Sequence, residues 1–235
     1  MGSIYLIRHG QASFGADDYD VLSPIGIRQS EVLGAHLSRT GSGFDRCITG
    51  SLRRQQHTAE LTLGQLDAAG LKTPTLEVDA AFNEFDAEAV IRALLPTLED
   101  EPEALHVMRH AAQHRAEFQR LFSMIVSRWL NGSHDNEGLQ SWQAFVAQVQ
   151  AGLHRMLERA ESGERIAVFT SGGTITALLH LITQMPAEQA FQLNWHIVNT
   201  SFNHLKFRGH EVALAGFNNY AHLQLTNTPE LITYR

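Results

Sequence analysis

Cysteine is almost absent from this chain of 235 residues, in which Cys47 stands alone. One cysteine can form no intramolecular disulfide and supplies no thiolate cluster for a metal, so the fold must be held by its core. The sequence also lacks an apolar run long enough to cross a membrane, and its N-terminus lacks the apolar stretch of a secretory signal. We therefore expect a cytoplasmic protein.

Positive charge is also scarce. The chain has 18 Lys and Arg against 25 Asp and Glu, which gives a net charge of -7. Such a balance provides no general attraction for nucleic acid or for an anionic membrane, and we expect neither as a partner. An anionic substrate must instead be held by a local basic pocket. No linker-like segment divides the chain, so we predict a single domain over residues 1–235.

Short apolar runs alternate with helical patterns along most of the chain. The predicted strands are Ile4–Ile7, Asp45–Thr49, Ile166–Phe169, Asn203–Phe207 and Val212–Phe217. The predicted helices that follow the first three strands are Ser23–Gly41, Ser51–Gly70 and Ser171–Leu181. This alternation predicts an α/β fold with three α/β/α layers and a mixed, mostly parallel sheet.

One stretch has helical periodicity and no strand pattern. Between Ala87 and Asn136, apolar side chains recur at steps of three and four residues, for example at Phe118, Leu121 and Ile125. We predict a helical insertion at about residues 87–136, placed as a cap over the sheet and responsible for substrate choice. Another helix is expected over about residues 139–160.

Three polar segments follow the first three predicted strands of the α/β pattern. They are Arg8-His9-Gly10, Arg53-Arg54 and Ser171-Gly172-Gly173. Ligands of α/β sheets bind beyond the carboxyl ends of strands, where helix N-termini present unpaired amides. Guanidinium groups match phosphate oxygens in a fixed geometry. Together these segments predict a site for a phosphoryl group. The Arg109-His110 pair follows no strand, so we interpret it as a structural or surface feature.

The sequence resembles a known family over nearly its whole length. The resemblance rests on blocks in family order: Leu6–Gln11 with Leu22–Gly26, Ser51–Ala59, Phe82–Asp86, Asn199–Ser201 and Phe217–Leu223. These look like the motifs of the histidine phosphatase superfamily, also called phosphoglycerate-mutase-like. The resemblance implies a phosphatase that acts without a metal or other cofactor on phosphomonoesters of small metabolites.

The resemblance also implies roles for individual residues. His9 matches the nucleophile that becomes a phosphohistidine, and Arg8 and Arg54 match the arginines that bind the phosphoryl group. Glu84 matches the proton donor. Gln11 and Ser13, in the loop after His9, are candidates for contact with the phosphate or the leaving group, with stabilisation of the loop as the alternative.

The fourth block departs from the family pattern. A second histidine stands immediately before Gly-Gly in the family, and Ser171 occupies that position here. Serine still donates a hydrogen bond, and the amides of Gly172 and Gly173 remain, but a potential positive charge is lost. Losing one preorganised donor typically lowers a rate by about 10²–10³. The sequence leaves open whether another histidine, at 180, 196 or 204, replaces the contact.

Two other functions stay open. One is a phosphoglycerate-type mutase, disfavoured because Ala12-Ser13-Phe14-Gly15 lacks the Trp-Asn of that subfamily. The other is a phospholigand-binding protein without catalysis, suggested by Ser171. His106, His110 and His114 recur at four-residue steps but have no carboxylate partner, so we expect exposed histidines and no metal site. Exposed strand edges would permit a homodimer.

Overall fold

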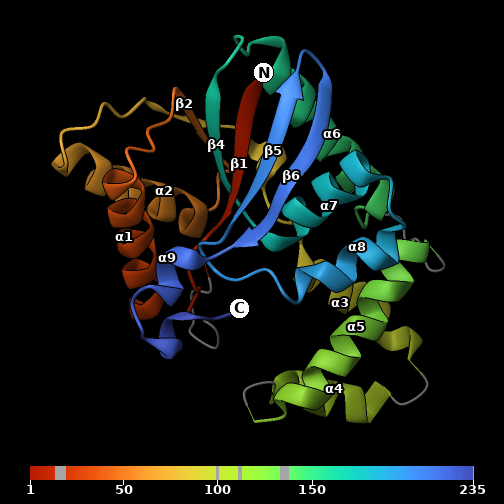
Figure 1. Ribbon diagram of the computed structural model, residues 1–235. Coiled ribbons are helices and arrows are strands. Elements are labelled where there is room, and N and C mark those ends of the chain that lie inside the picture. Colours follow the sequence, from red (N-terminus) through yellow and green to blue (C-terminus); the bar gives the residue numbers. More distant parts are fainter. Residues whose placement is uncertain (14–19, 99–100, 111–112, 133–137, 235) are drawn as a thin grey trace. The chain divides into compact units, whose positions relative to one another are not determined.

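The computed structural model describes residues 1–13, 20–98, 101–110, 113–132 and 138–234 (Figure 1). Two compact units emerge from the contacts within the chain. The first combines Met1–Glu84 with Gln148–Arg235, and the second is Phe85–Ala147. The single domain with an insertion at about residues 87–136 stays a prediction.

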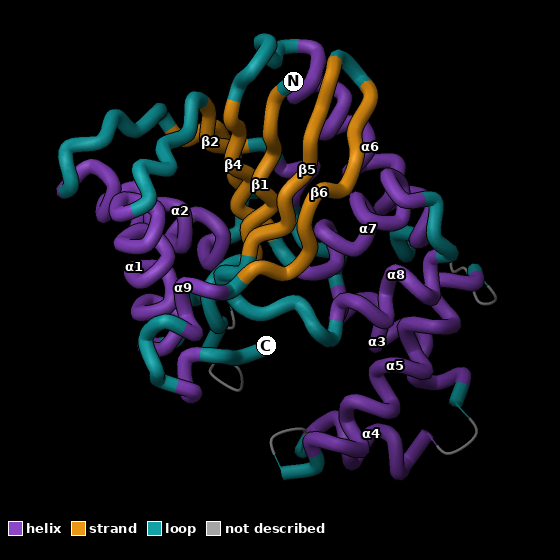
Figure 2. The backbone as a smooth tube through the Cα atoms, viewed as in Figure 1, coloured by secondary structure: helices purple, strands orange, loops and turns teal. Residues whose placement is uncertain are grey.

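A six-stranded sheet forms the centre of the first unit, in the order β3-β2-β4-β1-β5-β6 (Figure 2). The strands are β1 (Gly2–Arg8), β2 (Arg46–Thr49), β3 (Leu76–Val78), β4 (Arg165–Thr170), β5 (Phe202–Arg208) and β6 (Glu211–Asn219). The first four strands pair in parallel, while β5 and β6 pair antiparallel to their neighbours. The carboxyl ends of β1, β2 and β4 therefore meet at one edge of the sheet.

Helices cover both faces of this sheet. In the first unit, the long helices α1 (Pro24–Arg39) and α2 (Arg53–Ala68) pack against each other, and α2 contacts β2 and β4. Helix α7 (Gly172–Thr183) contacts β1 and β6. Because successive strand side chains point to opposite faces, strands covered on both sides are apolar throughout, as the continuous apolar runs indicated. The predicted three-layer α/β fold with a mixed sheet is confirmed.

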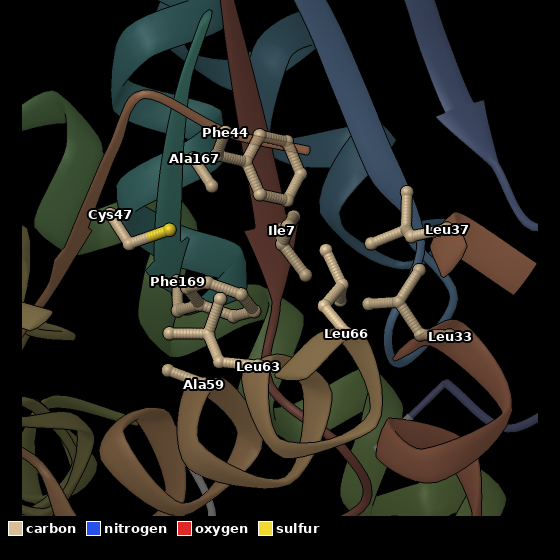
Figure 3. Close-up of a cluster of buried hydrophobic side chains, with 10 residues drawn as sticks. All are labelled: Ile7, Leu33, Leu37, Phe44, Cys47, Ala59, Leu63, Leu66, Ala167 and Phe169. Atoms are coloured by element: carbon tan, nitrogen blue, oxygen red, sulfur yellow. The ribbon is translucent and has the colours of Figure 1, made fainter. Parts of the chain in front are cut away.

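The core beneath α1 and α2 gathers side chains from three strands and both helices (Figure 3). Ile7, Cys47 and Phe169 come from adjacent strands, and Leu33 and Leu66 come from the helices. Burial raises the pKa of the Cys47 thiol to about 12, so this side chain acts as a small apolar residue. The one cysteine serves packing.

The second unit is helical in its described residues. It contains α3 (Ala87–Leu94), α4 (Glu101–Arg109), α5 (Arg115–Asn131) and the start of α6 (Trp142–Glu158). Phe85 stacks on Trp129 with ring centroids 4.6 Å apart, and Trp142 meets Trp129 edge-on at 5.4 Å. Gly132, with φ of +63°, ends α5 in the left-handed conformation that glycine adopts without strain. Residues 99–100, 111–112 and 133–137 of this stretch lie outside the described residues.

The remaining elements were not predicted. β3 has three residues, and α8 (Ala187–Asn194) and α9 (Ala221–Gln224) are short helices near the C-terminus. No helix in the described part of the chain is both long and apolar enough to cross a membrane.

Candidate active site

The predicted site residues come from three neighbouring strands. His9 follows β1, Arg54 lies in the first turn of α2 after β2, and Ser171 precedes α7 after β4. The amide of His9 donates to the Thr170 carbonyl over 2.8 Å, which joins the ends of β1 and β4. These residues therefore lie at the same edge of the sheet, as the parallel pairing requires.

The His9 imidazole is buried, with 4% of its surface exposed. Its Nδ1 lies 2.7 Å from the Gly10 carbonyl oxygen, and because a carbonyl only accepts, Nδ1 carries the ring proton. Burial, and then the charges of Arg54 and Arg8, hold the pKa of His9 well below its usual 6.5. The ring is therefore neutral, and its Nε2 carries no proton.

The loop after His9 is held in place by its neighbours. The Gly10 amide donates to Thr58 Oγ1 over 3.0 Å, and the same hydroxyl donates to the Arg54 carbonyl over 2.7 Å. Asn199 Nδ2 donates to the His9 carbonyl over 3.0 Å. A Cβ on Gly10 would lie 2.5 Å from the Gly26 carbonyl oxygen, so only glycine permits this approach of the loop to α1. The imidazole is thus oriented in advance.

Both predicted arginines are nearly buried and lie close to His9. Arg54 Nε is 3.3 Å from His9 Nε2. Arg8 donates through Nη1 to the Ile197 carbonyl. Two guanidinium groups beside a neutral imidazole suit a dianionic phosphoryl group, because they balance its charge where water is largely excluded.

Asp20 is a site neighbour that the sequence reasoning missed. Its Oδ1 lies 2.7 Å from Arg54 Nη1, and its Oδ2 accepts from the Arg53 amide over 2.9 Å. Cations at a helix N-terminus oppose the helix dipole unless an anion is near, and the Asp20 carboxylate is that anion for α2. Two adjacent cations at the start of a predicted helix were the available signal, but this pattern did not identify the partner.

Glu84 reaches the same edge through the N-terminus of α7. Its Oε2 accepts from the Gly173 amide over 3.0 Å. The chain before Glu84 is anchored by two hydroxyls, since Thr170 donates to the Phe82 carbonyl over 2.6 Å and Thr174 to the Asn83 carbonyl over 2.7 Å. The Gly173 amide, expected to face the phosphate, thus positions the predicted acid instead.

Ser171 and Gly172 have neighbours in α2 and at the end of β1. Ser171 is fully buried, and its Oγ is 2.7 Å from Gln55 Nε2. A Cβ on Gly172 would lie 3.8 Å from Arg8 Nε, which places this glycine next to the guanidinium. The Gly-rich helix start therefore lies close to Arg8, and Gln55 is a neighbour that the sequence reasoning missed.

The two loop candidates are placed differently. Gln11 Oε1 accepts from Ser23 Oγ over 2.8 Å, and the Gln11 amide donates to Gln29 Oε1 over 2.8 Å. The Ser13 amide donates to the Val21 carbonyl over 2.9 Å. The bonds of Gln11 agree with the loop-stabilising alternative for this residue. Residues 14–19 lie outside the described residues. They include Phe14 and Gly15, two of the four residues whose identity disfavoured a mutase.

The histidines named as substitutes for the missing one have other surroundings. His180 Nδ1 lies 2.7 Å from the Met185 carbonyl oxygen near the end of α7. The ring of His204 stacks on Tyr5 with centroids 4.7 Å apart. His196 is exposed, in the segment after α8. The side chain that contacts Ser171 is therefore an amide, Gln55.

The three histidines at four-residue steps do lie near one another. The His106 ring centroid is 4.4 Å from that of His110 and 5.7 Å from that of His114. Nδ1 of His110, the residue after α4, lies 2.9 Å from the His106 carbonyl oxygen. Across the described ranges, no group of three or more His, Cys, Asp or Glu residues is placed to hold a metal ion.

Comparison with known proteins gives one family. The family model described as "Histidine phosphatase superfamily (branch 1)" matches residues 4–116 and 104–220. A 2,3-bisphosphoglycerate-dependent phosphoglycerate mutase of Sinorhizobium fredii is 25% identical over 206 residues, which cover 82% of this chain and 85% of that protein. The resemblance inferred from the motifs is thereby confirmed.

Solved structures show the same fold. A phosphoglycerate mutase of Bacillus anthracis is similar with a TM-score of 0.63 and 17% identity, covering 95% of each chain. Phosphoserine phosphatase of Entamoeba histolytica, solved in complex with 3-phosphoglyceric acid, is similar with a TM-score of 0.60 and 18% identity. That match covers 95% of this chain and 100% of the other. Both phosphatases and mutases thus occur among the relatives.

Proposed function

Because the chain belongs to the histidine phosphatase superfamily, we propose that it hydrolyses phosphomonoesters of small metabolites through a phosphohistidine on His9. The observation that carries this proposal is the tautomer of His9. The Gly10 carbonyl holds the proton on Nδ1, so Nε2 offers its lone pair beside Arg54. A histidine with a structural role has no need of a neutral ring between two buried cations.

The reaction has two displacements at phosphorus. In the first, the Nε2 lone pair forms the N–P bond, the ester P–O bond breaks, and protonated Glu84 gives its proton to the leaving alkoxide. In the second, a water oxygen attacks phosphorus, the N–P bond breaks, and Glu84 takes a proton from that water. Inorganic phosphate leaves and Glu84 is protonated again, so the enzyme returns to its starting state.

The arginines provide the electrostatic part of catalysis. Arg8 and Arg54 bind the non-bridging oxygens and balance their charge through a loose transition state. Buried guanidinium groups need no reorganisation during the reaction. We propose that no metal or other cofactor takes part, so hydrolysis continues in the presence of a chelator.

The test is hydrolysis of p-nitrophenyl phosphate with EDTA present. We expect a clear rate from the wild type and a loss of turnover in His9→Ala, because the nucleophile is gone. His154→Ala, which removes an exposed histidine of α6, is the matched control and should keep the wild-type rate. Rapid quenching in alkali should trap an acid-labile, base-stable phosphoprotein in the wild type alone. A His9→Ala variant with full activity would end the assignment.

The same proteins distinguish the alternatives. The Sinorhizobium fredii relative is named as a mutase, so interconversion of 3- and 2-phosphoglycerate should be assayed beside phosphate release. Interconversion without phosphate release would replace the hydrolase by a mutase. Binding of inorganic phosphate without either reaction would favour the phospholigand-binding protein. The net charge of -7 supports a small anionic metabolite caught by the two arginines rather than nucleic acid or a membrane as the partner.

A further inference from the structure

Ser171, which stands where the family has its second histidine, has a side-chain partner in α2. Gln55 Nε2 lies 2.7 Å from Ser171 Oγ, and both residues are fully buried. Gln55 directly follows Arg54, whose Nε is 3.3 Å from the His9 imidazole. Ser171 directly follows Thr170, whose carbonyl accepts from the His9 amide. The two residues thus directly follow, in sequence, two residues that contact His9, at the same edge of the sheet.

The Phe82 carbonyl determines which end of the Gln55 amide faces Ser171. Its oxygen lies 3.1 Å from Gln55 Nε2. A carbonyl only accepts, so exchanging the amide nitrogen and oxygen would set two acceptors against each other. The two Nε2 hydrogens are thus used by Phe82 and Ser171. Ser171 Oγ is the acceptor in this bond, and its own hydrogen points away from Gln55.

The helix after Ser171 does not use the hydroxyl either. A serine before a helix usually accepts from an amide of the first turn, but Ser171 makes no such bond. The Gly173 amide donates to Glu84 instead. Among the described residues no acceptor for the Ser171 hydrogen is found. The structure thus holds, at the edge where the site lies, a buried hydroxyl whose hydrogen is accepted by no described residue.

Burying the Gln55 amide also lowers the stability of the fold, which a role in packing alone does not explain. Its Oε1 is buried and has no hydrogen-bond partner among the described residues. Leaving a buried acceptor unpaired typically costs about 1–3 kcal/mol, and an apolar side chain of similar size would avoid that cost. The amide nitrogen, in contrast, makes two hydrogen bonds, and one of them orients the Ser171 hydroxyl.

Building on the proposed phosphohydrolase function, we propose that Gln55 is a positioning residue for Ser171, and that this uncharged pair replaces the family's second histidine as a hydrogen-bond donor to the phosphoryl group. Ser171 touches the phosphoryl oxygen, and Gln55 acts through Ser171. Unlike an imidazole, this pair keeps the same charge across the pH range in which histidine titrates. All positive charge at the phosphoryl group then comes from Arg8 and Arg54.

A double-mutant cycle tests the coupling. The proteins are wild type, Gln55→Met, Ser171→Ala and the double variant, each assayed for binding of inorganic phosphate and for kcat and KM with p-nitrophenyl phosphate. Each single variant should weaken phosphate binding by roughly 10- to 100-fold, the usual effect of one hydrogen bond to a charged group. The double variant should be no weaker than Ser171→Ala, because Gln55 acts only through Ser171. Losses that multiply in the double variant would overturn the proposal.

Gln56→Met is the matched control. Gln56 lies next along α2 and donates to the Ser51 carbonyl over 3.0 Å, without contact to Ser171. It should bind phosphate as the wild type does. Thermal unfolding of every variant identifies any that fails to fold, and Gln55→Leu then takes the place of Gln55→Met in the cycle.

A swap to the family residue gives an independent readout. In the Gln55→Ala, Ser171→His variant, the introduced imidazole has the room vacated by the amide. Its kcat/KM, divided by that of the wild type at each pH, should fall as pH rises through the titration of the new histidine. The division cancels the ionisation of the substrate, which both proteins share. A ratio that stays flat with pH would overturn the proposal.

Failure of this inference differs from failure of the proposed function. Phosphate binding needs no turnover, so coupling in binding with no hydrolysis in any variant would remove the phosphohydrolase and keep the donor pair. Independent losses at the two positions, beside His9-dependent hydrolysis, would remove the donor pair and keep the phosphohydrolase.

Discussion

At His9, one backbone carbonyl decides which ring nitrogen carries the proton. The Gly10 oxygen accepts from Nδ1 and leaves Nε2 unprotonated, while burial and two nearby arginines keep the ring neutral. Motif matching named the residue but not the nitrogen. Which nitrogen is unprotonated follows from the hydrogen bond between His9 and Gly10, and this bond depends on the conformation of the loop.

Glu84 gives a prediction at the same scale. Glu84→Gln should slow the formation of phosphohistidine by roughly 10²–10⁴ for alkyl monoesters, because their alkoxide leaves poorly without a proton. For p-nitrophenyl phosphate, whose leaving group needs little protonation, the same step should change far less. Rapid-quench measurement of phosphohistidine formation separates this step from the later attack of water.

The matched control for Glu84 is Glu88→Gln, which neutralises an exposed carboxylate four positions along the chain. It should leave both substrates unaffected. An equal slowing of alkyl and aryl esters by Glu84→Gln would contradict the role of Glu84 as the acid for the leaving group.

Among the elements, helix α1 shows how a local cap also supports the site. Ser23 Oγ accepts from the Gly26 amide over 3.1 Å, and Pro24 occupies the first helical position. The same hydroxyl donates to Gln11 in the loop after His9. The Ser23 hydroxyl that caps α1 thus has a second bond, to a residue twelve positions away.

Ser23→Ala should lower the free energy of unfolding by about 1 kcal/mol, the usual value of a helix cap, because the Gly26 amide loses its acceptor. Urea denaturation measures the change. Ser38→Ala is the matched control within α1, since that hydroxyl donates to the Ala35 carbonyl of its own helix. A change in Ser38→Ala as large as in Ser23→Ala would argue against the cap as the cause.

The elements that were predicted share a strong local pattern. Buried strands with continuous apolar runs, and helices with a cap and a regular stripe, were found within a few residues of their bounds. β3 is only three residues long, and none of its residues is buried, so no periodicity marks it. Helix α8 is eight residues long and follows Pro186, where the sequence reasoning expected no helix. Such short elements depend on tertiary contacts, since β3 pairs with β2 and α8 packs against α7.

For the molecule as a whole, buried histidines make stability depend on pH. Burial, and then the charge of His36, lower the pKa of His222 from 6.5 to about 3. Its Nε2 lies 3.0 Å from Thr200 Oγ1 in the buried C-terminal part of the first unit. As pH falls below 6.5, the unfolded chain takes up a proton at this residue and the folded chain does not.

The free energy of unfolding should therefore fall on acidification between pH 6.5 and about 3, and this group should have no effect above that range. The slope from one histidine is at most about 1.4 kcal/mol per pH unit. His222→Gln keeps a polar side chain without the titration, so its stability should depend less on pH. Urea denaturation of both proteins at several pH values measures the difference, to which the shared His9 contributes nothing. Parallel pH profiles would contradict the assignment.

The sequence by itself determined the fold class, the family and the residues at the carboxyl edge of the sheet. It did so because apolar runs, helix caps and motif blocks are local patterns, and because parallel pairing brings strand ends together whatever the details. Arg8, His9 and Arg54 were found together for this reason.

Only the tertiary structure decided how these residues are oriented. Asp20 pairs with Arg54 from 34 positions away, Glu84 bonds the Gly173 amide from 89 away, and Gln55 bonds Ser171 from 116 away. No local pattern encodes such pairs, because each depends on how two distant backbone segments approach each other in the folded core. The replacement of the family's second histidine by an amide and a hydroxyl became visible only when these segments were brought together.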